Sequence, residues 1–275
     1  MLPWNYGFHW NAGTILFLGA FYTVLVVVAT TLLAAAFRSR RDLAAGREQN
    51  IRWHADFHDL PPADRACRHV LTGEFRHREC PHAFDCRECE THARWIARHP
   101  VAAGEEDEIF GMAFPLDRYY HRGHTWARPE RDGTVTIGLD DLAARLVGTP
   151  DAVELPDPGA RLEVNGTAFT VRKRDAEIAV LAPVDGEVTA VGGPAKGWYL
   201  KVKPAGIGEP GFRHLLRGAE IRPWLLREME RLQIALTAEG AAATLADGGA
   251  PVADIAASYP EANWDAICGE MFLRP

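Results

Sequence analysis

Residues 168–186 read Ala-Phe-Thr-Val-Arg-Lys-Arg-Asp-Ala-Glu-Ile-Ala-Val-Leu-Ala-Pro-Val-Asp-Gly. Two short runs in this stretch place an apolar residue at every second position: Phe169/Val171, and then Ile178/Val180. A period of two residues is typical of a β-strand with one buried face. Two such runs on either side of a polar turn predict a β-hairpin with its apex at Lys173–Asp175.

Sequence motifs on both sides of the hairpin extend from about His121 to Pro204. They are His124-Thr-Trp126, Asp132-Gly-Thr-Val-Thr-Ile-Gly138, Leu139–Leu146, Val153-Glu-Leu-Pro156, Pro158-Gly159, Ala182-Pro183-Val-Asp-Gly186-Glu-Val188 and Gly197-Trp-Tyr-Leu-Lys-Val-Lys-Pro204. In order and spacing, this set resembles the H protein of the glycine cleavage system. The resemblance implies a mainly β fold, the barrel-sandwich hybrid of lipoyl and biotinyl domains, which we expect over residues 105–216.

The resemblance also implies a lipoyl-lysine at the hairpin apex, and here the chain departs from the family. In the family this lysine lies eight residues before the proline of the Ala-Pro-x-x-Gly motif. Counting back eight residues from Pro183 gives Asp175, whereas Lys173 lies ten residues before it. The acidic loop that H proteins carry before Gly-Trp is also reduced, to Gly192–Lys196.

The chain has only four lysines: Lys173, Lys196, Lys201 and Lys203. Lys201 and Lys203 are expected in a strand near the end of the domain, so Lys173 is the one plausible attachment site for lipoate. The alternative is a solvated turn lysine between Arg172 and Arg174. That alternative is favoured, because Asp175 stands where the family has its lysine.

The composition excludes several classes of function. The 275 residues carry a formal net charge of −7 with a pI of about 5.9, which argues against a nucleic-acid partner because phosphate binding needs a basic surface. The sequence has no glycine-rich phosphate loop, Gly-x-Ser-x-Gly elbow or His-Glu-x-x-His helix. We therefore expect a carrier-like or adaptor protein and not an enzyme.

A membrane anchor is predicted at the N-terminus. Ile15 to Phe37 is a run of 23 residues without a charged side chain, long enough at about 1.5 Å per residue to cross a bilayer. Arginines follow the run at 38, 40 and 41, and no Lys or Arg precedes it. The positive-inside rule then puts residues 1–14 outside and the soluble part in the cytoplasm. We expect a single span of the inner, or cytoplasmic, membrane over 15–37 and a juxtamembrane helix or spacer over 38–60.

A cleaved signal peptide is the alternative, since Ala34–Ala36 resembles a cleavage site. The position of the arginines and the length of the apolar run argue against it.

Four of the five cysteines lie within residues 61–100, in the pattern C-x12-C-x5-C-x2-C formed by Cys67, Cys80, Cys86 and Cys89. A two-residue gap lets two thiolates turn toward one ion, and two earlier cysteines can complete a tetrahedron. We expect a structural zinc, with an iron–sulfur cluster as the alternative. Arg65, Arg68 and Arg87 are expected to offset the thiolate charge, and His69, His82 and His92 are spare ligands.

Two other interpretations of these cysteines stay open. Two disulfides would need an oxidising compartment, which the predicted topology does not provide. A redox-active dithiol at Cys86 and Cys89 would need a strand-to-helix context that the flanking sequence lacks. The fifth cysteine, Cys268, is expected to be a small buried residue.

Residues 217–275 are predicted to form amphipathic helices. Pro223 suits the first turn of a helix reaching about Thr237, and apolar residues recur at helical spacing in it and in two shorter segments. The three stripes are Leu225/Met229/Leu232/Leu236, Val252/Ile255/Ala256/Tyr259 and Trp264/Ile267/Cys268/Met271/Phe272. We expect these helices to pack on the barrel or on the cysteine segment; binding to another subunit is the alternative.

Together these features predict a membrane-tethered adaptor protein without lipoate, with a structural metal and with other protein subunits as partners. A lipoyl carrier with lipoamide on Lys173 is the first alternative. An iron–sulfur electron-transfer subunit is the second. His121 and His124 are expected to be ordinary hydrogen-bonding residues.

Overall fold

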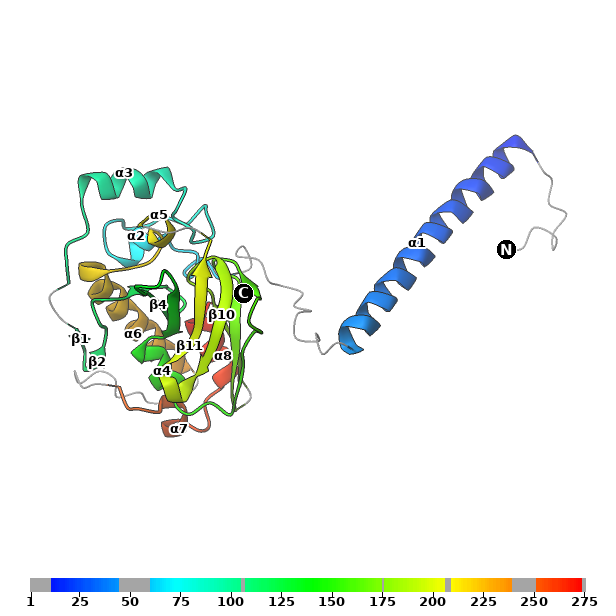
Figure 1. Ribbon diagram of the computed structural model, residues 1–275. Helices are drawn as coiled ribbons and strands as arrows, with labels where there is room; N and C mark the ends of the chain where they lie inside the picture. Colours follow the sequence, from blue (N-terminus) through cyan, green and yellow to red (C-terminus); the bar gives the residue numbers. More distant parts are fainter. Residues whose placement is uncertain are drawn as a thin grey trace. The chain divides into compact units, whose positions relative to one another are not determined.

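The computed structural model describes residues 11–44, 60–104, 107–174, 176–205, 209–238 and 251–273 (Figure 1). The chain divides into two compact units, Met1–His54 and Ala55–Pro275. Most of the predicted extracytoplasmic segment 1–14 and of the juxtamembrane segment 38–60 lies outside the described residues.

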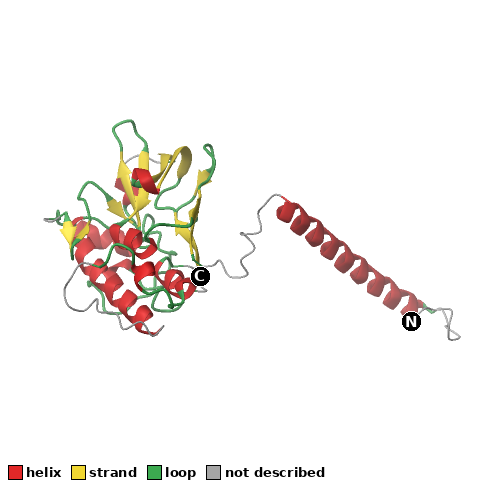
Figure 2. Cartoon of the chain, turned by 90° about the horizontal axis from the view of Figure 1, so that it is seen from below, coloured by secondary structure: helices red, strands yellow, loops and turns green. Residues whose placement is uncertain are grey.

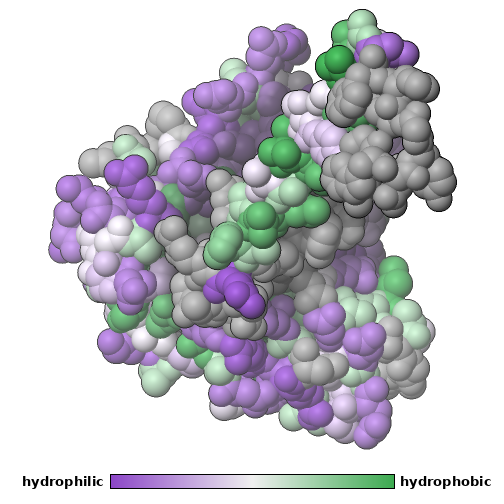
Figure 3. Space-filling view, turned by 90° about the vertical axis from the view of Figure 1, so that its right-hand side faces the viewer, coloured by the Kyte–Doolittle hydropathy of each residue, from purple (hydrophilic) through white to green (hydrophobic). Residues whose placement is uncertain are grey.

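In the first unit the structure describes one long helix, α1 (Ala12–Ala44). Its segment Ile15–Ala34 is long and apolar enough to cross a membrane, and Figure 3 shows hydrophobic side chains along it. The hydroxyl groups of Thr23 and Thr30 donate to the carbonyl oxygens of Gly19 (2.7 Å) and Val26 (2.8 Å). These bonds satisfy polar groups within the helix itself, as an apolar environment requires. A secretion signal near an N-terminus has the same length and composition.

Two β-sheets form the centre of the second unit, in agreement with the predicted lipoyl-type fold, while helices contribute about as many of its described residues as strands do. The larger has the spatial order β3 (Tyr119–Tyr120), β4 (Thr125–Pro129), β5 (Val135–Leu139), β11 (Trp198–Pro204), β10 (Gly186–Gly193) and β7 (Arg161–Leu162). The smaller has the order β6 (Ala152–Glu154), β8 (Thr167–Lys173) and β9 (Ala176–Leu181). All neighbouring strands are antiparallel. A separate short pair joins β1 (Glu108–Ile109) and β2 (Met112–Ala113).

The predicted hairpin is confirmed as β8 and β9. Phe169 pairs with Val180 and Val171 with Ile178, and all four side chains are buried. The Phe169 ring stacks on Tyr199 of β11 with 4.5 Å between ring centroids. The apolar alternation therefore forms the face that packs the small sheet onto the large one.

The cysteine segment contains two short helices, α2 (Arg68–Leu71) and α3 (Glu90–Arg98). Residues 139–146 of the H-protein motif include most of helix α4 (Asp141–Val147), whose N-cap Asp140 accepts a hydrogen bond from the Ala143 N–H at 2.8 Å. Such a cap contributes about 1 kcal/mol. Short 3-10 turns lie at η3 (Pro194–Lys196) and η4 (Gly218–Glu220).

The C-terminal region forms α5 (Glu209–Phe212), α6 (Ile221–Ala238), α7 (Ile255–Ser258) and α8 (Trp264–Met271). Figure 2 shows most helices of this unit gathered on one side of its strands. Trp224 of α6, Ile255 of α7 and Trp264 of α8 are fully buried in the same hydrophobic core as the barrel strands. The predicted packing of these helices on the barrel is thus confirmed. Cys268 is buried in this core, as expected.

Candidate functional site

Lys173 ends strand β8, and its side chain is buried, with 8 % of the residue exposed. Its Nζ donates to the carbonyl oxygen of Thr149 at 2.7 Å and pairs with Oδ2 of Asp254 at 3.3 Å. The prediction of a solvated turn lysine is therefore wrong. The physical reason is that the C-terminal segment, 81 residues further along the chain, packs over the end of the hairpin.

Asp254 joins three parts of the fold at this point. Its Oδ1 caps α7 by accepting a hydrogen bond from the Ala257 N–H at 2.8 Å, while Oδ2 faces Lys173. Burial acts to raise the pKa of this carboxyl, but the Ala257 hydrogen bond and the Lys173 ammonium outweigh it and lower the pKa. Gly148, the C-cap of α4, has φ 59° and lies so close that a Cβ would overlap the Asp254 carboxyl group. Only glycine fits there.

These contacts decide whether lipoate fits the hairpin. Attachment needs an amine that reaches the solvent, and it converts the charged ammonium into a neutral amide. The Lys173 amine is buried and holds an ion pair that an amide could not replace. Asp175 lies outside the described residues, while Lys196 is in η3 and Lys201 and Lys203 are in β11. The lysines that the structure describes do not fit a lipoyl arm at the apex.

The four clustered cysteines come from two paired segments and the loop that follows them. The Cys67 N–H donates to the Arg78 carbonyl and the Cys80 N–H to the Arg65 carbonyl, each at 2.8 Å. This pairing places Cys67 and Cys80 close together. Cys86 and Cys89 follow, with the Cys89 N–H 3.3 Å from the Cys86 carbonyl oxygen. All four are buried, and all are free thiols.

Burial also suppresses the ionisation of two of these thiols, Cys67 and Cys86. It raises the pKa of Cys67, and it raises the pKa of Cys86 to about 12, with the neighbouring cysteines adding to both effects. The mutual repulsion indicates that the four thiols share one region. Among the described residues, however, no group of three or more His, Cys, Asp or Glu side chains is arranged to hold a metal ion. The four thiols therefore lie in one region but do not form a metal-binding group.

The arginines expected to balance the thiolate charge have carboxylate partners of their own. Arg65 pairs with Glu79 at 3.8 Å, Arg68 with Glu220 at 2.6 Å, and Arg87 with both Asp85 (2.6 Å) and Asp185. Of the spare histidines, His69 and His92 form a buried pair, with 3.1 Å between Nε2 of His69 and Nδ1 of His92. His82 is exposed.

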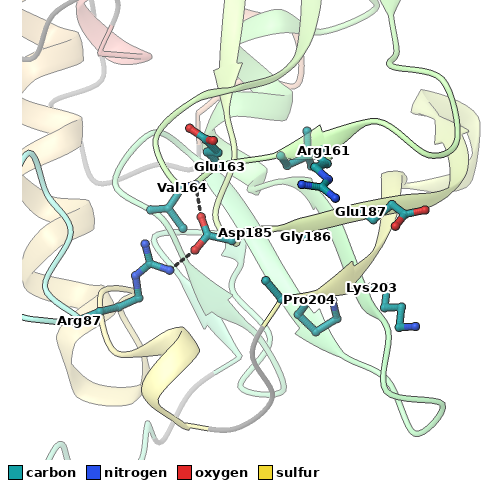
Figure 4. Close-up of a pocket in the computed structure, with 11 residues that line it drawn as sticks. Arg87, Arg161, Glu163, Val164, Asp185, Gly186, Glu187, Lys203 and Pro204 are labelled. Atoms are coloured by element: carbon teal, nitrogen blue, oxygen red, sulfur yellow. Dashed lines mark hydrogen bonds and ion pairs between the residues drawn. The ribbon is translucent and has the colours of Figure 1, made fainter.

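Arg87 also links the cysteine segment to the barrel at an open cleft that sequence analysis did not identify (Figure 4). Asp185 receives the Arg87 guanidinium on Oδ2 and the Val164 N–H on Oδ1 at 2.7 Å. The cleft measures about 780 Å³, and charges of both signs line it, including Arg161, Glu163, Glu187 and Lys203. In the sequence, the only indication of this cleft was Asp185, the aspartate within the Ala-Pro-x-x-Gly motif.

A buried network of charges joins the barrel to α6 and the cysteine segment. Nδ1 of His124 lies 2.9 Å from Asp140 Oδ2, and its Nε2 lies 3.6 Å from Glu228 Oε2. Arg231 contacts both Glu228 and Asp64 at 2.7 Å. Burial alone would lower the pKa of His124, but the two carboxylates raise it to about 9. His124 is thus a buried hydrogen-bonding residue, as expected, and the two carboxylates favour its charged form.

Comparison with known proteins gives one family. The family model of the glycine cleavage H-protein matches residues 118–194. The H protein of Neisseria gonorrhoeae is 35 % identical over 113 residues, which are 36 % of this chain and 85 % of that protein. The H protein of Saccharophagus degradans is 36 % identical over 103 residues, 33 % of this chain and 79 % of that protein. A solved H-protein structure from Mycobacterium marinum is 25 % identical and covers 38 % of this chain and 94 % of its own, with a TM-score of 0.33.

Proposed function

The chain belongs to the glycine cleavage H-protein family, and on this basis we propose that it is a membrane-tethered binding protein whose lipoyl-type domain works without lipoate. One observation carries the proposal: the only lysine of the hairpin is buried against Thr149 and Asp254. A carrier arm serves several sites because its tether keeps it mobile at a high local concentration. An amine held beneath α7 is not available for such a tether. The barrel then provides a surface for other protein subunits.

Protein purified from its native host is expected to have the mass encoded by its gene, with no adduct on Lys173. Intact-mass spectrometry followed by peptide mapping measures this directly. A dithiolane or octanoyl adduct on Lys173 would contradict the proposal and support a lipoyl carrier, the function that family membership favours. Lys173→Arg would then abolish labelling by an anti-lipoyl reagent, whereas the matched variant Lys196→Arg would not.

We further propose that α1 anchors the protein in the cytoplasmic membrane as a single span with its N-terminus outside. The apolar segment Ile15–Ala34 and the arginines at 38, 40 and 41 support this. The full chain is expected to stay in the membrane pellet after alkaline carbonate extraction, and a variant lacking residues 1–54 to appear in the soluble fraction. A mature N-terminus directly after Ala36 would identify a cleaved signal peptide instead.

We also propose a structural zinc in the cysteine segment, with ligands from Cys67, Cys80, Cys86 and Cys89. The burial and proximity of the thiols support it, as does the low aliphatic content of a segment that needs a staple to fold. The native preparation is expected to be colourless with one zinc per chain. Visible absorbance that bleaches on reduction would point to an iron–sulfur electron-transfer subunit, and a metal-free protein would contradict both assignments.

A further inference from the structure

A small cavity lies where the cysteine segment, the barrel and the residues after β11 meet. It measures about 10 Å³, which is at the lower limit of the space that one water molecule needs. Its polar lining consists of Arg68, Cys86, His121, Arg122 and His214. All five residues are buried, so a polar atom among them that stays unpaired is costly.

Both arginines of the lining use their terminal nitrogens elsewhere. Nη1 of Arg68 donates to the Arg213 carbonyl oxygen at 2.7 Å, and Nη2 pairs with Glu220 at 2.6 Å. Nη1 and Nη2 of Arg122 donate to two backbone carbonyl oxygens, at 2.8 and 2.6 Å. The Nε of each arginine is buried and has no hydrogen-bond partner within the described part of the chain. The cavity is therefore bordered by two residues that each have a spare N–H donor.

His214 contributes the opposite kind of group, a lone pair. Its Nε2 lies 2.8 Å from the Pro183 carbonyl oxygen, and because a carbonyl can only accept, Nε2 is the donor. Burial lowers the pKa of His214 to about 4, so the ring is neutral and Nδ1 holds a lone pair. Nδ1 has no hydrogen-bond partner among the residues that the structure describes. The Cys86 thiol donates to the Phe84 carbonyl oxygen at 3.7 Å, which leaves its sulfur as a weak second acceptor.

These groups determine the chemistry of the ligand, which has to accept from two N–H groups and donate to one lone pair. A metal cation would meet two guanidinium charges and could not accept a hydrogen bond. An anion could accept both N–H groups, but the Nδ1 lone pair would repel it.

The charges of the two arginines are also met already. Arg68 pairs with Glu220, and the carboxylates of Glu228 and Asp64 act on Arg122. A neutral ligand that both donates and accepts therefore suits the cavity best. Water has these properties and this size, and buried waters typically make about three hydrogen bonds to otherwise unpaired polar groups.

We propose that the cavity is a binding site for one ordered water molecule, which accepts from Nε of Arg68 and Nε of Arg122 and donates to Nδ1 of His214. The second hydrogen of the water is directed to the Cys86 sulfur. The water links α2 of the cysteine segment, the turn between β3 and β4, and the segment that follows β11. This inference depends neither on the proposed zinc nor on the state of Lys173.

A high-resolution crystal structure of the full-length protein tests the assignment directly. One spherical peak of electron density is expected within about 3.2 Å of Nδ1 of His214 and of the Nε atoms of Arg68 and Arg122. An anomalous bromide signal at this position after a bromide soak would identify an anion site and overturn the proposal. An anomalous zinc signal there, or a cavity without density, would also overturn it.

Variants of the two histidines give a second readout, in solution. Relaxation dispersion of the water oxygen nucleus counts the water molecules that stay bound for longer than the protein takes to tumble. His214→Phe removes the lone pair and is expected to hold one such water fewer than the wild-type protein.

His121→Phe is the matched control, because both ring nitrogens of His121 already have partners. Its Nδ1 accepts the Gly123 N–H at 3.0 Å, and its Nε2 donates to Asn165 Oδ1 at 2.9 Å. This variant is expected to keep the wild-type number of long-lived waters. An unchanged number in His214→Phe, or the same loss in both variants, would contradict the proposal. If His214→Phe does not fold, the crystal structure of the wild-type protein still decides.

Discussion

Replacing Glu228 with alanine is expected to lower the free energy of unfolding of the second unit by about 3–5 kcal/mol, the usual cost of breaking a buried ion pair by removing one partner. Glu228 is 1 % exposed, and its Oε2 lies 2.7 Å from Arg231 and 3.6 Å from His124. Its loss would leave both cations buried with one counter-charge fewer. Denaturant unfolding followed by tryptophan fluorescence measures the change.

Glu230→Ala is the matched control, since Glu230 lies exposed on the same helix. It is expected to change the stability by less than about 0.5 kcal/mol. Similar small effects for both substitutions would show that the buried network does not hold α6 to the barrel.

The network also gives the stability a defined pH dependence. The pKa of His124 is about 9 in the folded protein and about 6.5 in an unfolded chain. Because the folded value is raised, this stabilisation is complete below a pH of about 6.5 and is lost as the pH rises through about 9. The slope in that window approaches about 1.4 kcal/mol per pH unit. This slope of stability against pH is expected to become smaller in Glu228→Ala.

Replacing Gly148 with alanine is expected to cost about 3 kcal/mol and to uncover Lys173, because backbone strain and a steric clash act together. Gly148 has φ 59° and ψ −133°, and an added Cβ would overlap the Asp254 carboxyl group. Asp254 must then move, and with it the cap of α7 and the partner of Lys173. The measurement combines denaturant unfolding with the rate at which an amine reagent labels Lys173.

Gly159→Ala separates the two causes. Gly159 has φ 94°, and an added Cβ there would meet no atom within 4 Å, so this variant has the strain without the clash. It is expected to be destabilised by less and to leave Lys173 protected. Labelling of Lys173 at the wild-type rate in Gly148→Ala would contradict the idea that Asp254 guards this amine.

The parts of the fold that local pattern determines could be predicted from the sequence. The alternation of Phe169, Val171, Ile178 and Val180 predicted β8 and β9, since side chains on a strand alternate faces whatever lies further along the chain. The helical stripes of α6 and α8 were predictable for a similar reason. The motifs around the hairpin also identified the family correctly.

The features that depend on distant partners could not be predicted. The state of Lys173 depends on Asp254, 81 residues away, and Arg87 pairs with Asp185, 98 residues away. Neither pairing can be inferred from the spacing of residues or from the composition of the sequence. The raised pKa of His124 could not be predicted for the same reason. In the sequence, nothing distinguishes Glu228 from the other acidic residues of its helix.

The sequence separation between Lys173 and Asp254 has a consequence during translation. At a synthesis rate of about 5–20 residues per second, the ribosome needs roughly 4–16 s to add the 81 residues that separate them. Until Asp254 has been added, the Lys173 amine of the nascent hairpin lacks the segment that covers it in the folded protein. A lipoate-attaching enzyme that acts only on completed chains therefore encounters Lys173 after this amine has been buried.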